Sequence, residues 1–347
     1  GPGQTRPATR LAKVRVTLAL ARASRGASML RILRHGAPGF EAGGLSPDWR
    51  VPADAVWIEL VDPTRAEEVA VEQSIGLLLP TREEMSEIEA SSRLYQEDGG
   101  TFMTATVLVN ADGDLPTSAP VTFVLAGSRL ITIRYVEPRA FSVFAAQAER
   151  QPSLCPNGPQ TFLGLLDAII DRTADILERT AADVELQSRS IFRRPRGAEF
   201  EKILKSLGRD QNINSKARDS LVSLARLLSF AALAGQFDGE RDLRDHLKSL
   251  QRDVQSITDH SSYLASNITF LLDAALGLIN IEQNSIFKVF SVFSVVFLPP
   301  TLIAGIYGMN FEHMPELRWM EGYPMAIALM VAAAGVPLLV FKRKGWL

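Results

Sequence analysis

VFSVFSVVFLPPTLIAGIYGM, residues 289–309, and GYPMAIALMVAAAGVPLLVF, residues 322–341, contain no charged residue. Each stretch is close to the roughly 20 residues with which a helix crosses about 30 Å of hydrocarbon. The short segment between them can join two antiparallel helices. We therefore expect membrane-spanning helices at 286–310 and 323–342, connected by a loop at 311–322.

Basic residues flank this hairpin on one side. Lys288 precedes the first span, and the run 342–344 follows the second. Because Lys and Arg concentrate on the cytoplasmic side, we expect both chain ends inside, a basic cytosolic tail at 343–347 and the loop outside. The loop itself is acidic and carries Glu312, Glu316 and Glu321 against Arg318.

The first span has a polar stripe. Its members are spaced by near-whole helical turns and so share one face: Asn284, Ser291, Ser294, Thr301 and Gly305. Polar groups are costly against lipid, so the stripe faces either packed helices or a water-filled pore, and the spacing alone leaves both readings open. Neither span holds Asp or Glu. Hydroxyls, amides and carbonyls suit a strongly hydrated ion such as Mg²⁺, and two helices enclose a channel only as part of a ring of subunits.

The residues before the spans divide into three parts. Residues 1–28 are rich in Arg and Ala, and we expect a disordered tag or leader there. Residues 29–150 predict an α/β domain with a largely antiparallel or mixed sheet, including strands near 56–61, 101–110, 119–126 and 129–135 and helices at 66–76 and 81–91. Residues 151–285 predict long cytosolic helices at 160–193, at 197–234 and from Gly239 onward. Pro299 and Pro300 are expected to bend or loosen the last of these helices.

Composition excludes several functions. The net charge of −2 argues against nucleic-acid binding, and the single cysteine excludes an intrachain disulfide. The chain shows no nucleophile elbow, phosphate loop or metal-ligand pair, so we expect neither an enzyme nor an organic cofactor.

The segment Tyr307-Gly308-Met309-Asn310 resembles the Gly-Met-Asn signature of the CorA magnesium transporters, and the similarity extends through Met314-Pro315-Glu316-Leu317. Phe270–Gly277, Asn280–Asn284, Phe297–Thr301 and Phe341–Leu347 are also similar to that family, most nearly to its proteobacterial branch. The resemblance is almost continuous over 264–347 and weaker over 55–135.

The resemblance implies an α+β cytosolic domain, long stalk helices and two transmembrane helices in a homopentameric funnel of the bacterial inner membrane. It places a selectivity filter for hydrated Mg²⁺ at Gly308, Met309 and Asn310, with Gly308 allowing a tight turn. It assigns pore positions to Asn284, Thr301 and Gly305 and gate positions to Phe287, Phe290 and Leu298. The acidic loop would attract cations. Regulatory Mg²⁺ would bind Glu87 and a stalk acid, for which Asp245, Asp253 and Asp259 are the candidates.

Passive Mg²⁺ uptake is the function we predict, with Co²⁺ and Ni²⁺ as further candidate ions. A Zn²⁺ transporter of the related ZntB type is the nearest alternative, although the intact Gly308-Met309-Asn310 favours magnesium. Two alternatives belong to other functional classes. One is a membrane-anchored cytosolic enzyme, and the other is a non-conducting pentameric sensor or scaffold.

Overall fold

The computed structural model describes residues 29–44, 46, 48–87, 89–113, 116–193, 198–237, 239–310 and 314–345. The expectation for residues 1–28 lies outside this part of the chain. Two compact units are present, one reaching Arg193 and including Glu201–Phe270, the other formed mainly by the chain from Leu271 onward. Each unit is described by itself.

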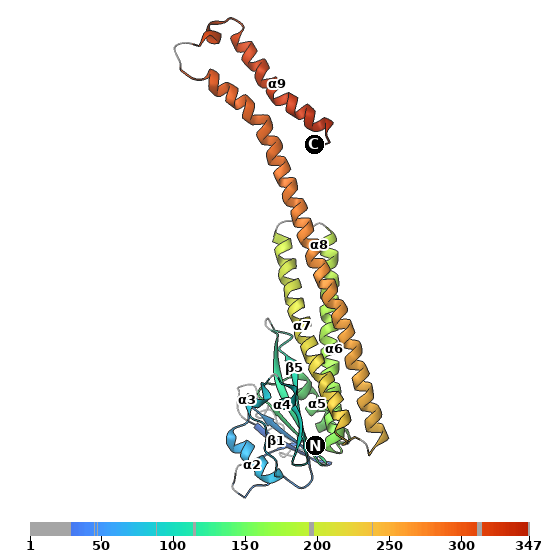
Figure 1. Ribbon diagram of the computed structural model, residues 1–347. Coiled ribbons are helices and arrows are strands. Elements are labelled where there is room, and N and C mark those ends of the chain that lie inside the picture. The colour runs from blue at the N-terminus through green and yellow to red at the C-terminus, as the bar shows by residue number, and fades with distance from the viewer. Residues whose placement is uncertain are drawn as a thin grey trace, which may run out of the picture. The chain divides into compact units, whose positions relative to one another are not determined.

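The first unit contains a seven-stranded sheet in the order β2-β1-β3-β7-β6-β5-β4 (Figure 1). Neighbouring strands are antiparallel except β3 and β7, which run parallel with Trp57 beside Leu130. The mixed sheet predicted from the sequence is therefore confirmed. Its strands are β1 (Met29–Arg34), β2 (Phe40–Ala42), β3 (Ala55–Val61), β4 (Leu94–Glu97), β5 (Gly100–Val109), β6 (Thr117–Ala126) and β7 (Arg129–Arg134).

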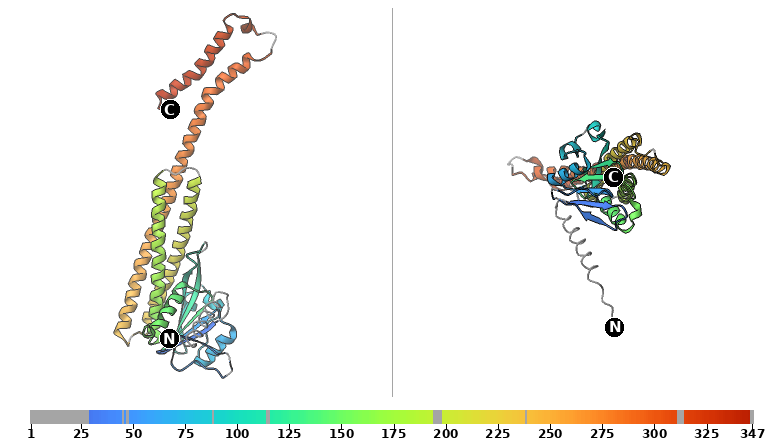
Figure 2. Two further views of the ribbon diagram at one scale, coloured as in Figure 1. Left: turned by 180° about the vertical axis from the view of Figure 1, so that it is seen from behind. Right: turned by 90° about the horizontal axis from the view of Figure 1, so that it is seen from below.

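Helices cover both faces of this sheet, and the views from behind and below show the layers (Figure 2). On one face, α2 (Arg65–Ile75) and α3 (Arg82–Met85) contribute Val71 and Met85 to a core with Ile58. On the other, the rings of α5 (Arg139–Arg150) and α6 (Gly158–Phe192) pack against the sheet, with Phe162 5.6 Å from Phe123. Burial on both faces explains why β3 is apolar at nearly every position.

The helix predicted at 81–91 is wrong in its length. Its capping box at Thr81 and Glu84 is present, but α3 ends at Met85 and a separate short helix, α4, spans Ala90–Arg93. The backbone carbonyl of Glu87 accepts a hydrogen bond from Arg93 Nε. At the end of α3, Ser86 Oγ donates to the carbonyl of Arg82, the acceptor that the Ser86 N–H would use in a continuing α-helix, and that N–H donates to Glu83 instead.

Three long helices lie side by side in the first unit: α6, α7 (Ala198–Leu233) and the first part of α8 (Arg241–Tyr307) (Figures 1 and 2). Buried polar pairs join them. Asn214 of α7 donates to the carbonyl of Ser261 of α8 at 3.0 Å, and Gln187 of α6 donates to Asp210 of α7 at 2.7 Å. The helices predicted at 160–193 and 197–234 are present as α6 and α7 within a few residues at each end, and the helix predicted from Gly239 onward begins at Arg241.

The second unit is a helical hairpin. It consists of the last part of α8, the 3₁₀ turn η2 (Pro315–Arg318) and α9 (Gly322–Arg343). Helix α8 continues through Pro299 and Pro300 to Tyr307. The two missing backbone donors therefore do not end the helix.

Candidate functional site

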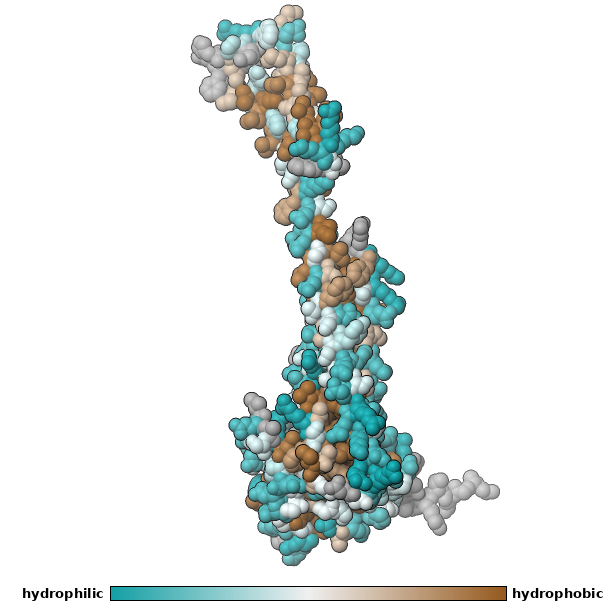
Figure 3. Space-filling view, turned by 45° about the vertical axis from the view of Figure 1, so that its right-hand side comes forward, coloured by the Kyte–Doolittle hydropathy of each residue, from teal (hydrophilic) through white to brown (hydrophobic). Residues whose placement is uncertain are grey.

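The two helices of the hairpin are long and apolar enough to cross a membrane. In their most apolar stretches, 0% of the residues of α8 and 6% of those of α9 are buried, which argues against the core helices of a soluble protein. Figure 3 shows their brown, hydrophobic side chains gathered on the surface of this hairpin. An apolar helix surface of this kind requires lipid or other apolar helices around it.

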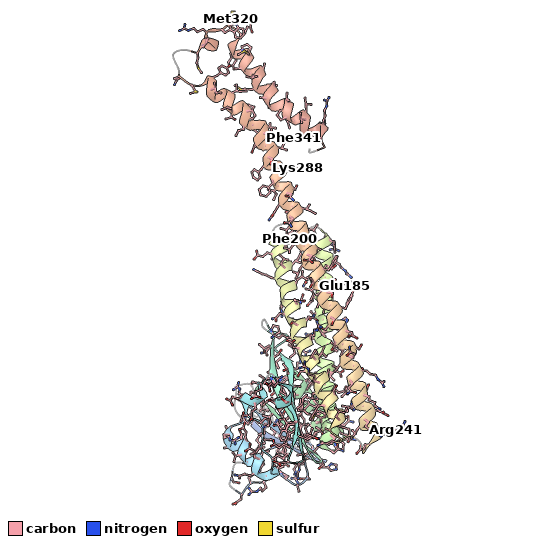
Figure 4. The ribbon with its side chains drawn as sticks, in the orientation of Figure 1. Glu185, Phe200, Arg241, Lys288, Met320 and Phe341 are labelled. Carbon is pink, nitrogen blue, oxygen red and sulfur yellow. The ribbon has the colours of Figure 1, made fainter. Side chains whose placement is uncertain are left out.

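Basic residues stand at one end of the hairpin and the connecting turn at the other. Lys288 and Phe341 lie toward the same end, and Met320 lies at the opposite end (Figure 4). Lys342 and Arg343 form the last turn of α9, directly after Phe341. The basic residues that flank the two spans therefore lie at the same end of the hairpin, as expected if that end faces the cytoplasm.

The expected pore residues share one face of a continuous helix. At 100° per residue, all eight fall within an arc of about 120°. Each is exposed in the single chain: Asn284, Phe287, Phe290, Ser291, Ser294, Leu298, Thr301 and Gly305. A Cβ added at Gly305 would meet nothing within 4 Å, so the chain itself does not require glycine there.

The hydroxyls of this stripe have a defined direction. Thr301 Oγ1 lies 2.7 Å from the carbonyl oxygen of Phe297, and Ser294 Oγ lies 2.9 Å from that of Phe290. A carbonyl cannot donate, so both hydroxyl protons point back into the helix. The outward side of each oxygen is left with lone pairs. The stripe therefore presents acceptors, a chemistry that suits the outward hydrogens of a hydrated cation.

The end of α8 leads into the expected filter. Gly308 N–H donates to the carbonyl of Ala304 at 2.9 Å, and Met309 N–H donates to that of Ile306 at 3.2 Å. A Cβ at Gly308 would lie 3.0 Å from the Ala304 oxygen. Space near that carbonyl therefore favours glycine at this position. Met309 and Asn310 are exposed.

An open hollow of about 550 Å³ runs along the same face, from Leu298 and Thr301 to Met309. Only α8 lines it. In the acidic loop, Glu321 is exposed, whereas Glu312 and the side chain of Glu316 lie outside the described part of the chain.

A model of the family described as "CorA-like Mg2+ transporter protein" matches residues 52–343. The chain belongs to the CorA family. It is 38% identical over 295 residues to the magnesium transport protein CorA of Yersinia pseudotuberculosis, covering 85% of this chain and 93% of the relative. It is 39% identical to the CorA of Escherichia coli K12 over 294 residues, 85% of this chain and 92% of the relative.

CorA architecture is also found by comparison of structures. The complete CorA magnesium transporter of Methanocaldococcus jannaschii superposes with a TM-score of 0.68 at 20% identity, covering 92% of this chain and 99% of the other. At this identity the likeness shows the fold alone. The fold class predicted from the sequence, a mixed α+β domain with long helices and two candidate membrane helices, is thereby confirmed.

The expected regulatory acids of this CorA chain are exposed: Glu87, Asp245, Asp253 and Asp259. Asp245 Oδ2 lies 3.8 Å from Arg241 Nε, and Asp259 Oδ1 accepts a hydrogen bond from Gln255 Nε2 at 3.0 Å. Among the described residues of one chain, no three acidic, histidine or cysteine side chains form a group that could hold a metal ion. Their role in binding regulatory Mg²⁺ between neighbouring subunits stays a prediction.

A further set of acids on α6 was not predicted from the sequence. Asp167, Asp171 and Asp175 recur every four residues and so share one face of the helix. The pKa of Asp171 is raised. Burial is the largest cause, and repulsion by the carboxylates of Asp167, Asp175 and the stalk residue Asp253 adds to it. The four-residue spacing was the signal that could have singled out this face.

Proposed function

We propose that this chain is the subunit of a homopentameric channel that carries Mg²⁺ passively across the bacterial inner membrane, driven into the cell by the membrane potential. The observation that carries the proposal is the arc on α8. Eight expected pore positions share about 120° of a helix whose polar face has no covering element in the described chain. A ring of subunits would bring five such faces together around one axis.

The chemistry of this arc fits a hydrated divalent cation. Mg²⁺ gives up its water reluctantly, so a pathway that keeps the ion hydrated needs acceptors facing inward. Ser294 and Thr301 offer such acceptors because their protons are bound to backbone carbonyls. At the outer mouth, Gly308, Met309 and Asn310 would form the filter, with the amide oxygen of Asn310 accepting from the ion's water shell.

Magnesium as the transported ion comes from the relatives, whose names describe magnesium transport. Co²⁺ and Ni²⁺ are further ions in the proposal. Both termini would be cytoplasmic, and Glu312, Glu316 and Glu321 would concentrate cations at the outer mouth. Cytosolic Mg²⁺ bound by Glu87 and a stalk acid of a neighbouring subunit would favour the closed state.

The test is ion flux into liposomes that carry the purified protein. Mg²⁺ entry is expected with the wild type and should be strongly reduced by Asn310→Ala. Val296→Ala is the matched control, because Val296 lies about 180° from the centre of the pore arc and should leave flux unchanged.

The alternatives give different results in the same assay. Entry of Zn²⁺ without Mg²⁺ would support a ZntB-type transporter. No flux of any divalent cation through an assembly of the expected size would support a sensor or scaffold. Unchanged Mg²⁺ entry in Asn310→Ala would show that the filter lies elsewhere.

A further inference from the structure

A second hollow, distinct from the pore face, lies between the two helices of the hairpin. It has a volume of about 390 Å³ and reaches from Ala304 on α8 and Gly308 just after it to Ala326 and Met330 on α9. We call it the hairpin pocket. Small residues create it, since Ala304, Gly308 and Ala326 leave space that larger side chains would fill.

The hairpin pocket points away from the pore arc. Ala304 and Tyr307 are centred about 130° around α8 from the middle of the pore arc. The ring that buries the pore arc between subunits therefore leaves this face on the outside of the assembly, toward lipid. That the hairpin pocket faces lipid rests on the proposed function, which requires a ring of subunits. The pocket itself is present in a single chain.

Water is a poor occupant of the hairpin pocket. The lining is mostly alanine, glycine, methionine and isoleucine. A buried water needs two to four polar partners, and apolar cavities stay dry. An empty cavity would also deprive its walls of dispersion contacts. Since a water molecule takes up about 30 Å³ in the liquid, the space accommodates roughly a dozen methylene-sized groups, a large part of one acyl chain.

The rim of the hairpin pocket matches the interface of a bilayer. Tyr307, Trp319 and Tyr323 line it, and such rings with polar tips concentrate at the level of lipid headgroups. Trp319 is 58% exposed and Tyr323 is 79% exposed. Arg318 precedes Trp319 in the chain and is exposed, so its guanidinium can reach a phosphate there.

From these features we propose that the hairpin pocket binds a phospholipid of the leaflet on the loop side. One acyl chain enters between α8 and α9, and the phosphate contacts Arg318. Gly308 belongs both to this pocket and to the proposed filter. The bound lipid therefore supports the wall behind the filter.

Retained phospholipid tests this proposal. The assembly is purified in detergent, and phosphorus is measured per chain. Ala304→Leu and Ala326→Leu fill the pocket from its two walls, whereas Ala328→Leu adds the same volume at an exposed position of α9. Wild type and Ala328→Leu are expected to retain one phospholipid per chain, and both pocket variants are expected to lose it.

Tryptophan fluorescence in vesicles of brominated phosphatidylglycerol gives an independent measurement. With Trp346→Phe as background, quenching of Trp319 should fall at least twofold in Ala304→Leu and remain unchanged in Ala328→Leu. Arg318→Gln should lower lipid retention without changing the assembly. Equal retention and equal quenching in Ala304→Leu, in an assembly of unaltered size, would overturn the proposal, as would a neighbouring subunit found filling the pocket.

Discussion

The hydroxyl of Thr301 donates to the carbonyl oxygen of Phe297 at 2.7 Å, which leaves its outward side a pure acceptor in the middle of the first span. Thr301→Val keeps the shape of the side chain but removes the acceptor. We expect it to lower Mg²⁺ flux in liposomes severalfold, whereas Thr301→Ser should keep most of the flux. Equal flux in all three proteins would mean that ions do not pass this position.

Glycine at position 305 should be required for close contact between subunits, but not for the stability of helix α8 within one chain. A Cβ at this position meets nothing within 4 Å in the chain, and the same holds for Gly277 elsewhere on α8. Both Gly→Ala changes raise helix propensity by up to about 1 kcal/mol. Gly305→Ala is therefore expected to reduce flux through crowding among subunits, with Gly277→Ala as the matched control. A larger loss of flux in Gly277→Ala would contradict the pore assignment.

The sheet contains a buried ion pair on which the fold depends. Arg134 Nη2 lies 2.6 Å from Glu59 Oε1, and both side chains are 0% exposed. Glu59 also pairs with Arg31. Glu59→Ala leaves the Arg134 guanidinium buried with only Glu137 as an acid partner, which should cost about 3–5 kcal/mol.

The melting temperature of the detergent-solubilised assembly measures this cost. Glu137→Ala is the control, because the Glu137 side chain is 38% exposed and its removal leaves the Glu59–Arg134 pair intact. The control should melt closer to the wild type. An unshifted melting temperature in Glu59→Ala would refute the dependence on this pair.

Asp210 should make the bundle less stable as the pH rises. Burial raises its pKa, so the folded chain holds a proton that the unfolded chain has already released above about pH 4. Between that pH and the raised pKa, the folded state binds more protons, and its stability falls with increasing pH. The buried Oε1 of Gln187 has no hydrogen-bond partner among the described residues. A protonated Asp210 could donate to it.

Asp210→Asn removes the titration and supplies an amide donor. We expect a higher melting temperature at pH 8 and a weaker pH dependence between pH 4 and 8 than in wild type. Glu178→Gln, at an exposed acid on α6 that does not affect the pKa of Asp210, should leave the wild-type dependence in place. Parallel pH profiles for Asp210→Asn and wild type would assign the dependence to other groups.

Local patterns predicted much of the fold. The charge-free run after Lys288 predicted the first span, and helical spacing predicted α6 and α7 closely. The pairing of Glu59 with Arg134 was not predictable, since 75 residues separate them and only the parallel contact of β3 with β7 brings them together. The end of α3 at Met85 was missed because the capping box at Thr81 marks where the helix begins and does not indicate where it ends.

The placement of the expected pore residues on one face of α8 was predictable for a different reason, whereas their roles as gate and filter stay a prediction from the resemblance. These residues lie along one helix, where the sequence spacing alone determines which side chains share a face. The sequence predicted that Pro299 and Pro300 bend or loosen α8, and the helix continues through both of them. The hairpin pocket joins Gly308 to Ala326 across two helices, and no spacing within one element could indicate it.

The hydroxyls of Ser294 and Thr301 donate to backbone carbonyls, and these bonds determine whether this face of α8 favours cations or anions. An anion such as chloride needs donors, and at these two levels the protons are held by the carbonyls of Phe290 and Phe297. In the proposed ring of subunits, lone pairs directed at the axis would repel it. This face of α8 would therefore discriminate against anions at these levels without carrying a charge of its own.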